Sequence, residues 1–384
     1  MCFSSLRRYF PALWQNAGMP TEAFAPARLR RVLVIKLRHH GDVLLAAPVI
    51  STLQRVAPQC EVDALVYADT APMLAGHPAL TQLHLIDRNW KRQGLRRQTA
   101  AEWRLIQALR ARRYDLVVHL SVHTRGAWLV RLLRPRWSVA PRFRPGFWAR
   151  SFTHYYPAQS DSQRHTVETN LDSLRALGIE PTAADKQLIL VPGAEAAARV
   201  ANLLVEHGLA AGGFIHIHAA SRWGFKCWPA ERVAALCDAL AARGWPLVLS
   251  SAPDAHELAL IADICAARDR NAVAPAPTLD LSGQLSLKEL AALTAKAKLF
   301  VGVDSAPMHM AAAMGTPVVA IFGPSGDLEW GPWDPLHKGH RVVASNTHPC
   351  RPCGMAGCND SKLSACLTTL PVAQVLSACE ELLK

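Results

Sequence analysis

The sequence predicts an α/β protein made of two doubly wound domains with parallel sheets. Buried-strand patterns alternate with helix patterns over two separate stretches, before and after a linker that begins near Pro181. The chain has 384 residues, of which 50% are apolar, so two cores of ordinary size can be buried. Polar side chains follow several predicted strands, at the sheet edge where α/β proteins bind ligands.

The first stretch opens with a buried strand at residues 31–36, after an N-terminal extension over residues 1–30. Residues 134–162 contain several prolines and aromatic residues, which predicts irregular structure. The first domain is therefore expected to span residues 31–180. Its other predicted elements are strands at 62–67, 84–86 and 116–120 and helices at 101–112 and 166–177.

The second stretch is expected to form a domain over residues 181–345. A cysteine-containing segment and a final helix follow over residues 346–384. A strand that ends at Val303 leads through a sharp turn into a short helix closed by Gly315. The other predicted elements are strands at 213–218, 246–251 and 318–323 and helices at 230–243 and 287–297.

The charge balance indicates an anionic partner. The net charge is +12, and arginines are concentrated between Arg88 and Arg150, with aromatic residues among the later ones. This pattern fits an anionic membrane surface or a phosphorylated, amphipathic substrate. Nucleic acid is the rival interpretation, but no helix-turn-helix, zinc-finger or RNP signature supports it, so no nucleic-acid partner is expected.

The sequence predicts a cytoplasmic protein. No apolar run approaches the ~18 residues that a membrane-spanning helix needs. The first thirty residues lack the uninterrupted apolar core of a signal peptide.

Ten cysteines in such a chain indicate thiols rather than a disulfide framework. Four of them cluster near His348 with a spacing that can hold zinc or another soft metal. The alternative is that they are reduced, structural thiols. The four are Cys350, Cys353, Cys358 and Cys366.

The first candidate site follows the first strand. Gly41 forms a tight turn that brings Asp42 to the start of a helix, where a carboxylate can accept a proton from a substrate hydroxyl. The structural alternative is that Asp42 only caps that helix. The chain contains neither G-x-G-x-x-G nor G-x4-G-K-[ST], which argues against dinucleotide oxidoreductases and P-loop enzymes.

Two further segments carry candidate anion-binding residues. Lys226 lies in the loop after the first strand of the second domain, where an ammonium can neutralise a departing diphosphate. Asp304 and Ser305 lie where another strand ends and a helix begins, so the helix N-terminus there offers free N–H groups. The alternatives are a solvated surface lysine and an ordinary strand-to-helix turn.

Together these segments resemble glycosyltransferase family 9, the ADP-heptose:lipopolysaccharide heptosyltransferases of Gram-negative bacteria. The resemblance covers about residues 31–384 and has three motifs: K-x4-G-D ending at Asp42, K-x-W-P starting at Lys226, and D-[ST]-x-x-x-H followed by G-T-P. The sequence around Asp42 and the cysteine cluster are most similar to the heptosyltransferase III branch. That branch adds a side-branch heptose to the second heptose of the inner core.

The resemblance implies a GT-B fold, with two Rossmann-like domains facing each other across a cleft. It also implies an inverting transfer from ADP-heptose that needs no cofactor and no catalytic metal. Asp42 matches the catalytic aspartate, and Ser251 to Glu257 lies where the family contacts adenosine. The residues that match donor-binding positions are Lys226, Asp304, Ser305, Ala306 and His309.

The arginine-rich stretch is expected to hold the phosphorylated inner-core acceptor at the cytoplasmic face of the inner membrane. The residues chosen for this role are Arg134, Arg136 and Arg142. The sequence also departs from the heptosyltransferase I branch, because Ala306 and Pro307 replace a glycine and a non-proline residue. Pro307 lacks an amide donor, which changes the expected contacts to the diphosphate.

Three other functions remain open at this stage. One is a heptosyltransferase II, or another family 9 transferase with a different acceptor or donor sugar. Another is a nucleotide-sugar-binding protein without catalysis, against which the presence of both Asp42 and Lys226 argues. The third is a metal-regulated interaction protein built around the cysteine cluster.

Overall fold

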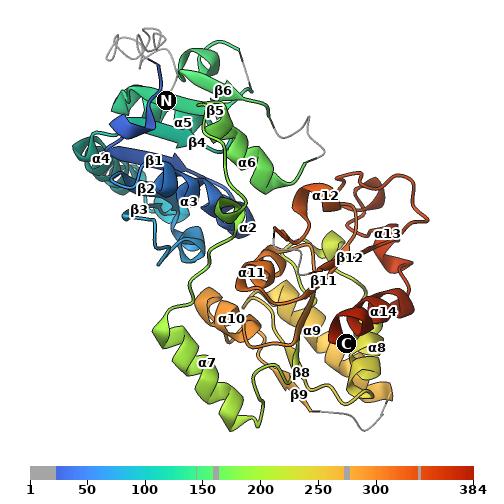
Figure 1. The fold of residues 1–384 in the computed structure, drawn as a ribbon. Helices are drawn as coiled ribbons and strands as arrows, with labels where there is room; N and C mark the ends of the chain where they lie inside the picture. The colour runs from blue at the N-terminus through green and yellow to red at the C-terminus, as the bar shows by residue number, and fades with distance from the viewer. Residues whose placement is uncertain (1–22, 144, 159–163, 272–276, 336–338) are drawn as a thin grey trace. The chain divides into compact units, whose positions relative to one another are not determined.

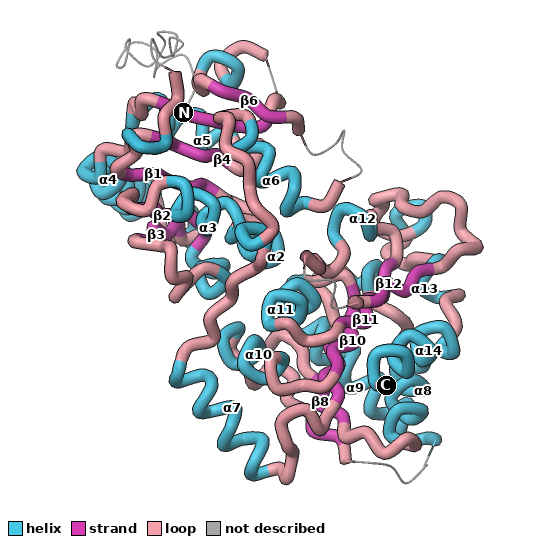
Figure 2. The backbone as a smooth tube through the Cα atoms, viewed as in Figure 1, coloured by secondary structure: helices cyan, strands magenta, loops and turns pink. Residues whose placement is uncertain are grey.

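The computed structural model describes residues 23–143, 145–158, 164–271, 277–335 and 339–384. The chain divides into two compact units, residues 1–187 and residues 188–384. Figure 1 shows both units as sheets with helices packed on them, and Figure 2 marks the same helices and strands by type. Residues 1–22 of the predicted N-terminal extension, including Cys2, lie outside the described residues.

The N-terminal unit contains a six-stranded sheet in the order β3-β2-β1-β4-β5-β6, and every neighbouring pair is parallel. This is the doubly wound order of Rossmann-like folds. The strands are β1 (Arg31–Ile35), β2 (Glu61–Tyr67), β3 (Gln82–Ile86), β4 (Leu116–His119), β5 (Trp137–Pro141) and β6 (His154–Tyr156). The helices are α2 (His40–Leu44), α3 (Ala47–Val56), α4 (Leu95–Arg112), α5 (Thr124–Leu133) and α6 (Thr166–Arg175).

The C-terminal unit repeats this architecture with a second six-stranded parallel sheet, in the order β12-β11-β10-β7-β8-β9. Its strands are β7 (Ile215–His218), β8 (Leu247–Leu249), β9 (Thr278–Asp280), β10 (Leu299–Val303), β11 (Val318–Phe322) and β12 (Arg341–Ala344). Its helices are α7 (Ala194–Glu206), α8 (Ala230–Ala241), α9 (Ala255–Asn271), α10 (Leu287–Thr294), α11 (Ala306–Met314), α12 (Asp327–Trp330), α13 (Ala365–Thr368) and α14 (Val372–Leu383).

Most central strands form because their sequences are apolar on both faces; β7 is the exception, since its buried His216 and His218 instead contact the Ser250 hydroxyl. In β4, β7, β10 and β11 every residue is buried. A parallel sheet covered by helices on both faces selects such continuous apolar runs over alternating ones. Gly302 lies within β10, where a side chain would place its Cβ 2.8 Å from the carbonyl oxygen of His218 on the neighbouring strand. Only glycine therefore fits at this position beside β7.

The prediction that residues 134–162 are irregular is wrong in part. This stretch contains β5 and β6, which complete the first sheet. The proline at position 141 is the last residue of β5, and hydrogen bonds link Ser138 of this strand to Thr153. The Thr153 hydroxyl donates to the Ser138 carbonyl at 2.7 Å, and the Ser138 amide donates to the Thr153 hydroxyl at 2.8 Å. The Ser138–Thr153 hydrogen bonds therefore link β5 to the segment before β6, in a stretch whose prolines and aromatic residues obscure the strand pattern.

Candidate functional site

Each sheet reverses its strand order at one place, between β1 and β4 in the N-terminal unit and between β7 and β10 in the C-terminal unit. Ligands of open α/β sheets bind at such a reversal, outside the carboxyl ends of the strands. The residues after β1, β7 and β10 are those that the sequence singled out: Asp42, Lys226 and Asp304. The fold therefore places a candidate half-site on each unit.

Lys226 and Asp304 form an ion pair in the C-terminal unit. The Lys226 Nζ lies 2.5 Å from Asp304 Oδ2, although the two residues are 78 positions apart in sequence. Lys226 closes the 3-10 turn Gly224–Lys226 that follows β7, and Asp304 comes directly after β10. The Asp304 side chain is 7% exposed and that of Lys226 is 23% exposed, so the ammonium is the accessible member of the pair. The solvated-surface interpretation of Lys226 is therefore wrong.

Ser305 is the N-cap of α11, but its hydroxyl does not cap the helix. Its Oγ is buried and has no hydrogen-bond partner within the described part of the chain. Ala306 begins α11, with Pro307 as the second helical residue. The helix N-terminus, the free hydroxyl and the Lys226 ammonium therefore meet next to one buried carboxylate, an arrangement suited to an anion such as a diphosphate.

His309, the residue that closes the third motif, lies in the same helix and is 3% exposed. It lies in the first turn of α11 and is shielded from solvent. Gly315 ends the helix in the left-handed conformation at φ 75°, as the sequence predicted.

The loop after β8 lies at the same edge of the second sheet. Glu257, in the first turn of α9, is buried and accepts a hydrogen bond from the Ala252 amide at 2.9 Å. Burial raises the pKa of the Glu257 carboxyl. This loop is the segment that the family resemblance associates with adenosine, and the structure places it beside the strand that leads to Lys226.

Asp42 lies within the first turn of α2 in the N-terminal unit. The N-cap of this helix is His39, so the alternative that Asp42 only serves as an N-cap is wrong. Asp42 is 8% exposed, and its Oδ1 lies 3.4 Å from Nε of Arg38. A partly desolvated carboxylate at the carboxyl end of β1 is well placed for general base chemistry.

Lys36 is a buried cation beside this carboxylate. Its Nζ donates to the Leu120 carbonyl at 2.9 Å and to Asn170 Oδ1 at 3.1 Å, and the residue is 4% exposed. Burial lowers the pKa of Lys36 to about 8, and the Asp42 charge opposes that shift. Lys36 is the first residue of the K-x4-G-D motif, but the sequence predicts no role for it. The burial of a lysine leaves no local signal in the sequence.

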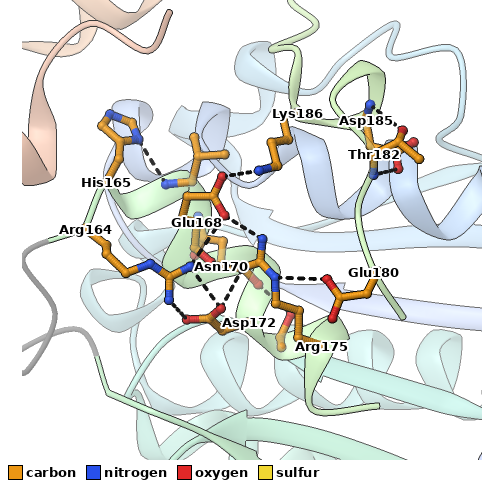
Figure 3. Close-up of polar contacts among 12 residues, drawn as sticks. Arg164, His165, Glu168, Asn170, Asp172, Arg175, Glu180, Thr182, Asp185 and Lys186 are labelled. Atoms are coloured by element: carbon orange, nitrogen blue, oxygen red, sulfur yellow. Dashed lines mark hydrogen bonds and ion pairs between the residues drawn. The ribbon is translucent and has the colours of Figure 1, made fainter. Parts of the chain in front are cut away.

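Asn170 connects this lysine to α6. Its amide nitrogen donates to the Leu45 carbonyl at 2.8 Å, so one side chain joins the end of β1 to the segment after α2. Figure 3 shows Asn170 on α6 among the ion pairs of that helix. Glu168 pairs with Arg175 and with Lys186, each at 2.6 Å. These contacts fix the helix from which Asn170 reaches Lys36.

We expect Lys36 to make stability pH-dependent between pH 8 and 10.5. Because its pKa is about 8 in the folded protein against 10.5 ordinarily, the unfolded chain binds more protons in this interval. The contribution of Lys36 to stability therefore rises with pH, by at most ~1.4 kcal/mol per pH unit. Urea unfolding of the wild type and of Lys36→Met across this interval measures the difference. Equal pH slopes for the two proteins would contradict a lowered pKa of the buried Lys36.

A pocket of about 380 Å³ opens at the same edge of the first sheet. Its walls come from the segments after β1, β2, β3 and β4 and from α4, so it forms only when the sheet is assembled. Burial and the positive charges of nearby lining cations lower the pKa of His123 in its wall. The lining cations are Arg38, Arg88, Lys91 and Arg125, and the lining acids are Asp87 and Glu102.

Three of these cations are already paired, one of them Arg38 with Asp42 at 3.4 Å. Arg125 lies 2.5 Å from Glu102, and Arg88 lies 3.6 Å from Asp69, with its guanidinium over the Tyr67 ring. Among the described residues Lys91 forms no ion pair. The pocket therefore carries more positive than negative charge and suits an anionic ligand.

The structure separates the three arginines that the sequence assigned to the acceptor. Arg134 caps the end of α5 and Arg136 precedes β5, so both lie at the amino ends of the strands, opposite Asp42. Arg136 stacks on the Trp137 ring at 4.6 Å. Arg142 follows β5 at the carboxyl edge. Their role as acceptor contacts stays a prediction, and the pocket cations are a second set that the sequence did not single out.

The nine described cysteines are all free. Cys350, Cys353 and Cys358 are exposed, and Cys366 is buried. Among the described residues, no group of three or more His, Cys, Asp or Glu side chains is arranged to hold a metal ion.

Comparison with known proteins agrees with this geometry. The profile of Glycosyltransferase family 9 (heptosyltransferase) matches residues 102–363. The chain is 36% identical over 300 residues to lipopolysaccharide heptosyltransferase 3 of Escherichia coli, covering 77% of this chain and 84% of that protein. The chain belongs to glycosyltransferase family 9. The prediction of a glycosyltransferase similar to heptosyltransferase III is confirmed.

Solved structures confirm the GT-B fold of this family 9 chain. A family 9 glycosyltransferase from Veillonella parvula superposes with a TM-score of 0.76 at 21% identity, covering 94% of this chain and 98% of that one. The E. coli ADP-heptose lps heptosyltransferase II superposes with a TM-score of 0.70 at 22% identity, covering 92% and 98%. At these identities the likeness concerns the fold alone.

Proposed function

We propose that this family 9 chain transfers L-glycero-D-manno-heptose from ADP-heptose to the second heptose of the lipopolysaccharide inner core. The observation that carries the proposal is the half-site around the Lys226–Asp304 pair, at the strand reversal of the C-terminal unit. It offers an ammonium, a free buried hydroxyl and a helix N-terminus to the diphosphate of a nucleotide-sugar. The similarity to heptosyltransferase 3 supports the choice of acceptor.

Each residue of the two half-sites has its own role in the proposed reaction. Asp42 takes the proton of the acceptor hydroxyl as its oxygen forms a bond to the anomeric carbon of the heptose. The bond from that carbon to the ADP oxygen breaks on the opposite face, so the configuration inverts. Lys226, the Ser305 hydroxyl and the Ala306 amide stabilise the charge that grows on the departing ADP. These groups offset the negative charge that develops on ADP. We therefore expect the reaction to need no cofactor and no catalytic metal.

The pocket beside Asp42 suits the acceptor. Its cations Arg38, Arg88, Lys91 and Arg125 fit a phosphorylated sugar of the inner core, since an anion there would meet more positive than negative charge. Arg38 belongs to both the pocket and the Asp42 environment. An acceptor phosphate bound to it would lie near the proposed base.

The first experiment measures ADP release from ADP-heptose with purified acceptors truncated after one or two core heptoses. We expect turnover only with the two-heptose acceptor, and a product heavier by one heptose. Transfer to the one-heptose acceptor would favour a heptosyltransferase II. Release of ADP without any acceptor-dependent product would contradict the transferase assignment, as would ADP-heptose binding without turnover.

Because the proposed acceptor is a lipid, we propose that the reaction takes place at the cytoplasmic face of the inner membrane. In the described part of the chain, no helix has both the length and the apolar character needed to cross a bilayer. We therefore propose that the protein associates with the membrane peripherally.

Zinc analysis of protein purified without chelators separates a metal site at the cysteine cluster from reduced thiols.

A further inference from the structure

The helix α4 presents an apolar and basic face that none of the described residues of its unit covers. Its inner side packs on the core through Ala101, Leu105 and Leu109. On the outer side Trp103 is 60% exposed, and Leu95 at the N-terminus of the helix is 65% exposed. Large apolar side chains exposed together with basic residues on one helix are typical of protein or membrane interaction sites.

The charges on this face all have one sign. Six exposed arginines lie on the helix and its flanking turns, and among the described residues none of them forms an ion pair. Glu102, the one acid of the helix, is engaged by Arg125. The six are Arg92, Arg96, Arg97, Arg104, Arg110 and Arg113.

The arginines at the start of α4 cost helix stability, whereas Arg110 in the last turn does not. Arg96 and Arg97 lie in the first turn of α4, which contains no acidic residue. Positive charges there oppose the positive end of the helix dipole, and like charges close together repel each other. An external anionic surface removes both penalties, whereas solvent alone does not.

We propose that the α4 face, consisting of Leu95, Trp103 and the six arginines, docks on an anionic lipid surface. Arginine heads pair with lipid phosphates, while the indole and the leucine enter the interfacial layer, where amphipathic side chains are most stable. Figure 1 shows α4 at the outer side of its unit.

The same helix contributes to the acceptor pocket. Gln98 and Glu102 of α4 line that pocket, so a membrane held against α4 lies close to the wall of the site. A lipid-anchored sugar would then reach Asp42 without leaving the bilayer. This benefit rests on the proposed function, but the docking itself can be measured without any sugar.

The test is co-sedimentation of the full-length chain with lipid vesicles. We expect binding to phosphatidylcholine vesicles that contain about one third phosphatidylglycerol, little binding to pure phosphatidylcholine, and release near 1 M salt, where the Debye length is about 3 Å. The variant Arg97→Gln/Arg104→Gln should bind about 25-fold more weakly, because each arginine near the surface contributes about fivefold. The variant Trp103→Ser should bind about tenfold more weakly.

Matched controls lie on the C-terminal unit. Lys296→Gln/Lys362→Gln removes the same charge from two exposed lysines, and Val205→Ser removes an apolar side chain that is 78% exposed. Neither control should change vesicle binding. Equal losses in the controls and the α4 variants would overturn the proposal, because binding would then follow net charge alone.

Two further outcomes keep docking and function apart. The lipid proposal fails if the protein does not bind anionic vesicles. It also fails if the protein binds a short DNA duplex and the α4 variants weaken only that binding. Heptose transfer to a delipidated, water-soluble acceptor is measured in parallel and should be equal in the wild type and in Trp103→Ser. If the wild type shows no transfer to this acceptor, the proposed function is contradicted, but the result on vesicle binding is unaffected.

Discussion

Replacing Asp42 by Asn is expected to lower the rate of heptose transfer ~100- to 10,000-fold, the range that a positioned general base contributes. The asparagine keeps the shape of the side chain and can still contact Arg38, but it cannot take the proton of the acceptor hydroxyl. ADP binding should stay nearly unchanged, because the proposed nucleotide contacts lie on the C-terminal unit. Single-turnover transfer and calorimetric titration with ADP measure the two effects separately.

The control for this substitution is Asp263→Asn, which makes the same chemical change at an exposed position of α9. We expect it to retain full transfer. Thermal unfolding of Asp42→Asn shows whether the fold is intact, since only a folded, ADP-binding and inactive variant supports the base assignment. Normal turnover by Asp42→Asn would exclude this carboxylate as the base.

Several central strands could be predicted from the sequence because they are apolar on both faces. The strand over residues 31–36 and the one that ends at Val303 are examples, and both are found in the structure. The edge strands β6, β9 and β12 could not, since they are three or four residues long and only partly buried. An edge strand depends on its neighbour more than on its own composition.

The helix α7 was missed for a different reason. The sequence predicts a linker after Pro181, but the structure has a 13-residue helix there with an alanine-rich first half. Only three of its residues are buried, so the apolar stripe that signals a packed helix is narrow. Intrinsic helix propensity gives a weaker signal than a broad buried face.

The candidate site, like the fold, could be predicted only in part. Asp42, Lys226 and Asp304 could be identified individually, because each follows a recognisable strand within a motif. Their environments could not, since the Lys226–Asp304 contact joins the ends of β7 and β10 through a pairing that only the assembled sheet creates. The acceptor pocket likewise takes one wall from each of several strand ends, none of which forms a motif alone.

Replacing Lys226 by Met is expected to weaken ADP binding about 30-fold, because a hydrogen bond to a charged group contributes about 2 kcal/mol. The rate of transfer should fall further, by ~100- to 1,000-fold, since the same ammonium stabilises the charge that develops as ADP departs. The substitution also leaves the Asp304 carboxylate, only 7% exposed, without its partner. We therefore expect a loss of unfolding free energy of about 1–3 kcal/mol.

The double variant Lys226→Met/Asp304→Asn separates these effects. It removes the unpaired charge, so stability should return towards the wild-type value, while ADP binding and transfer stay low. Lys296→Met, at an exposed position of the same unit, should change neither property. If the double variant recovered ADP affinity together with stability, Lys226 would act only by pairing with Asp304. Unchanged affinity and rate in the single variant would remove it from the donor site altogether.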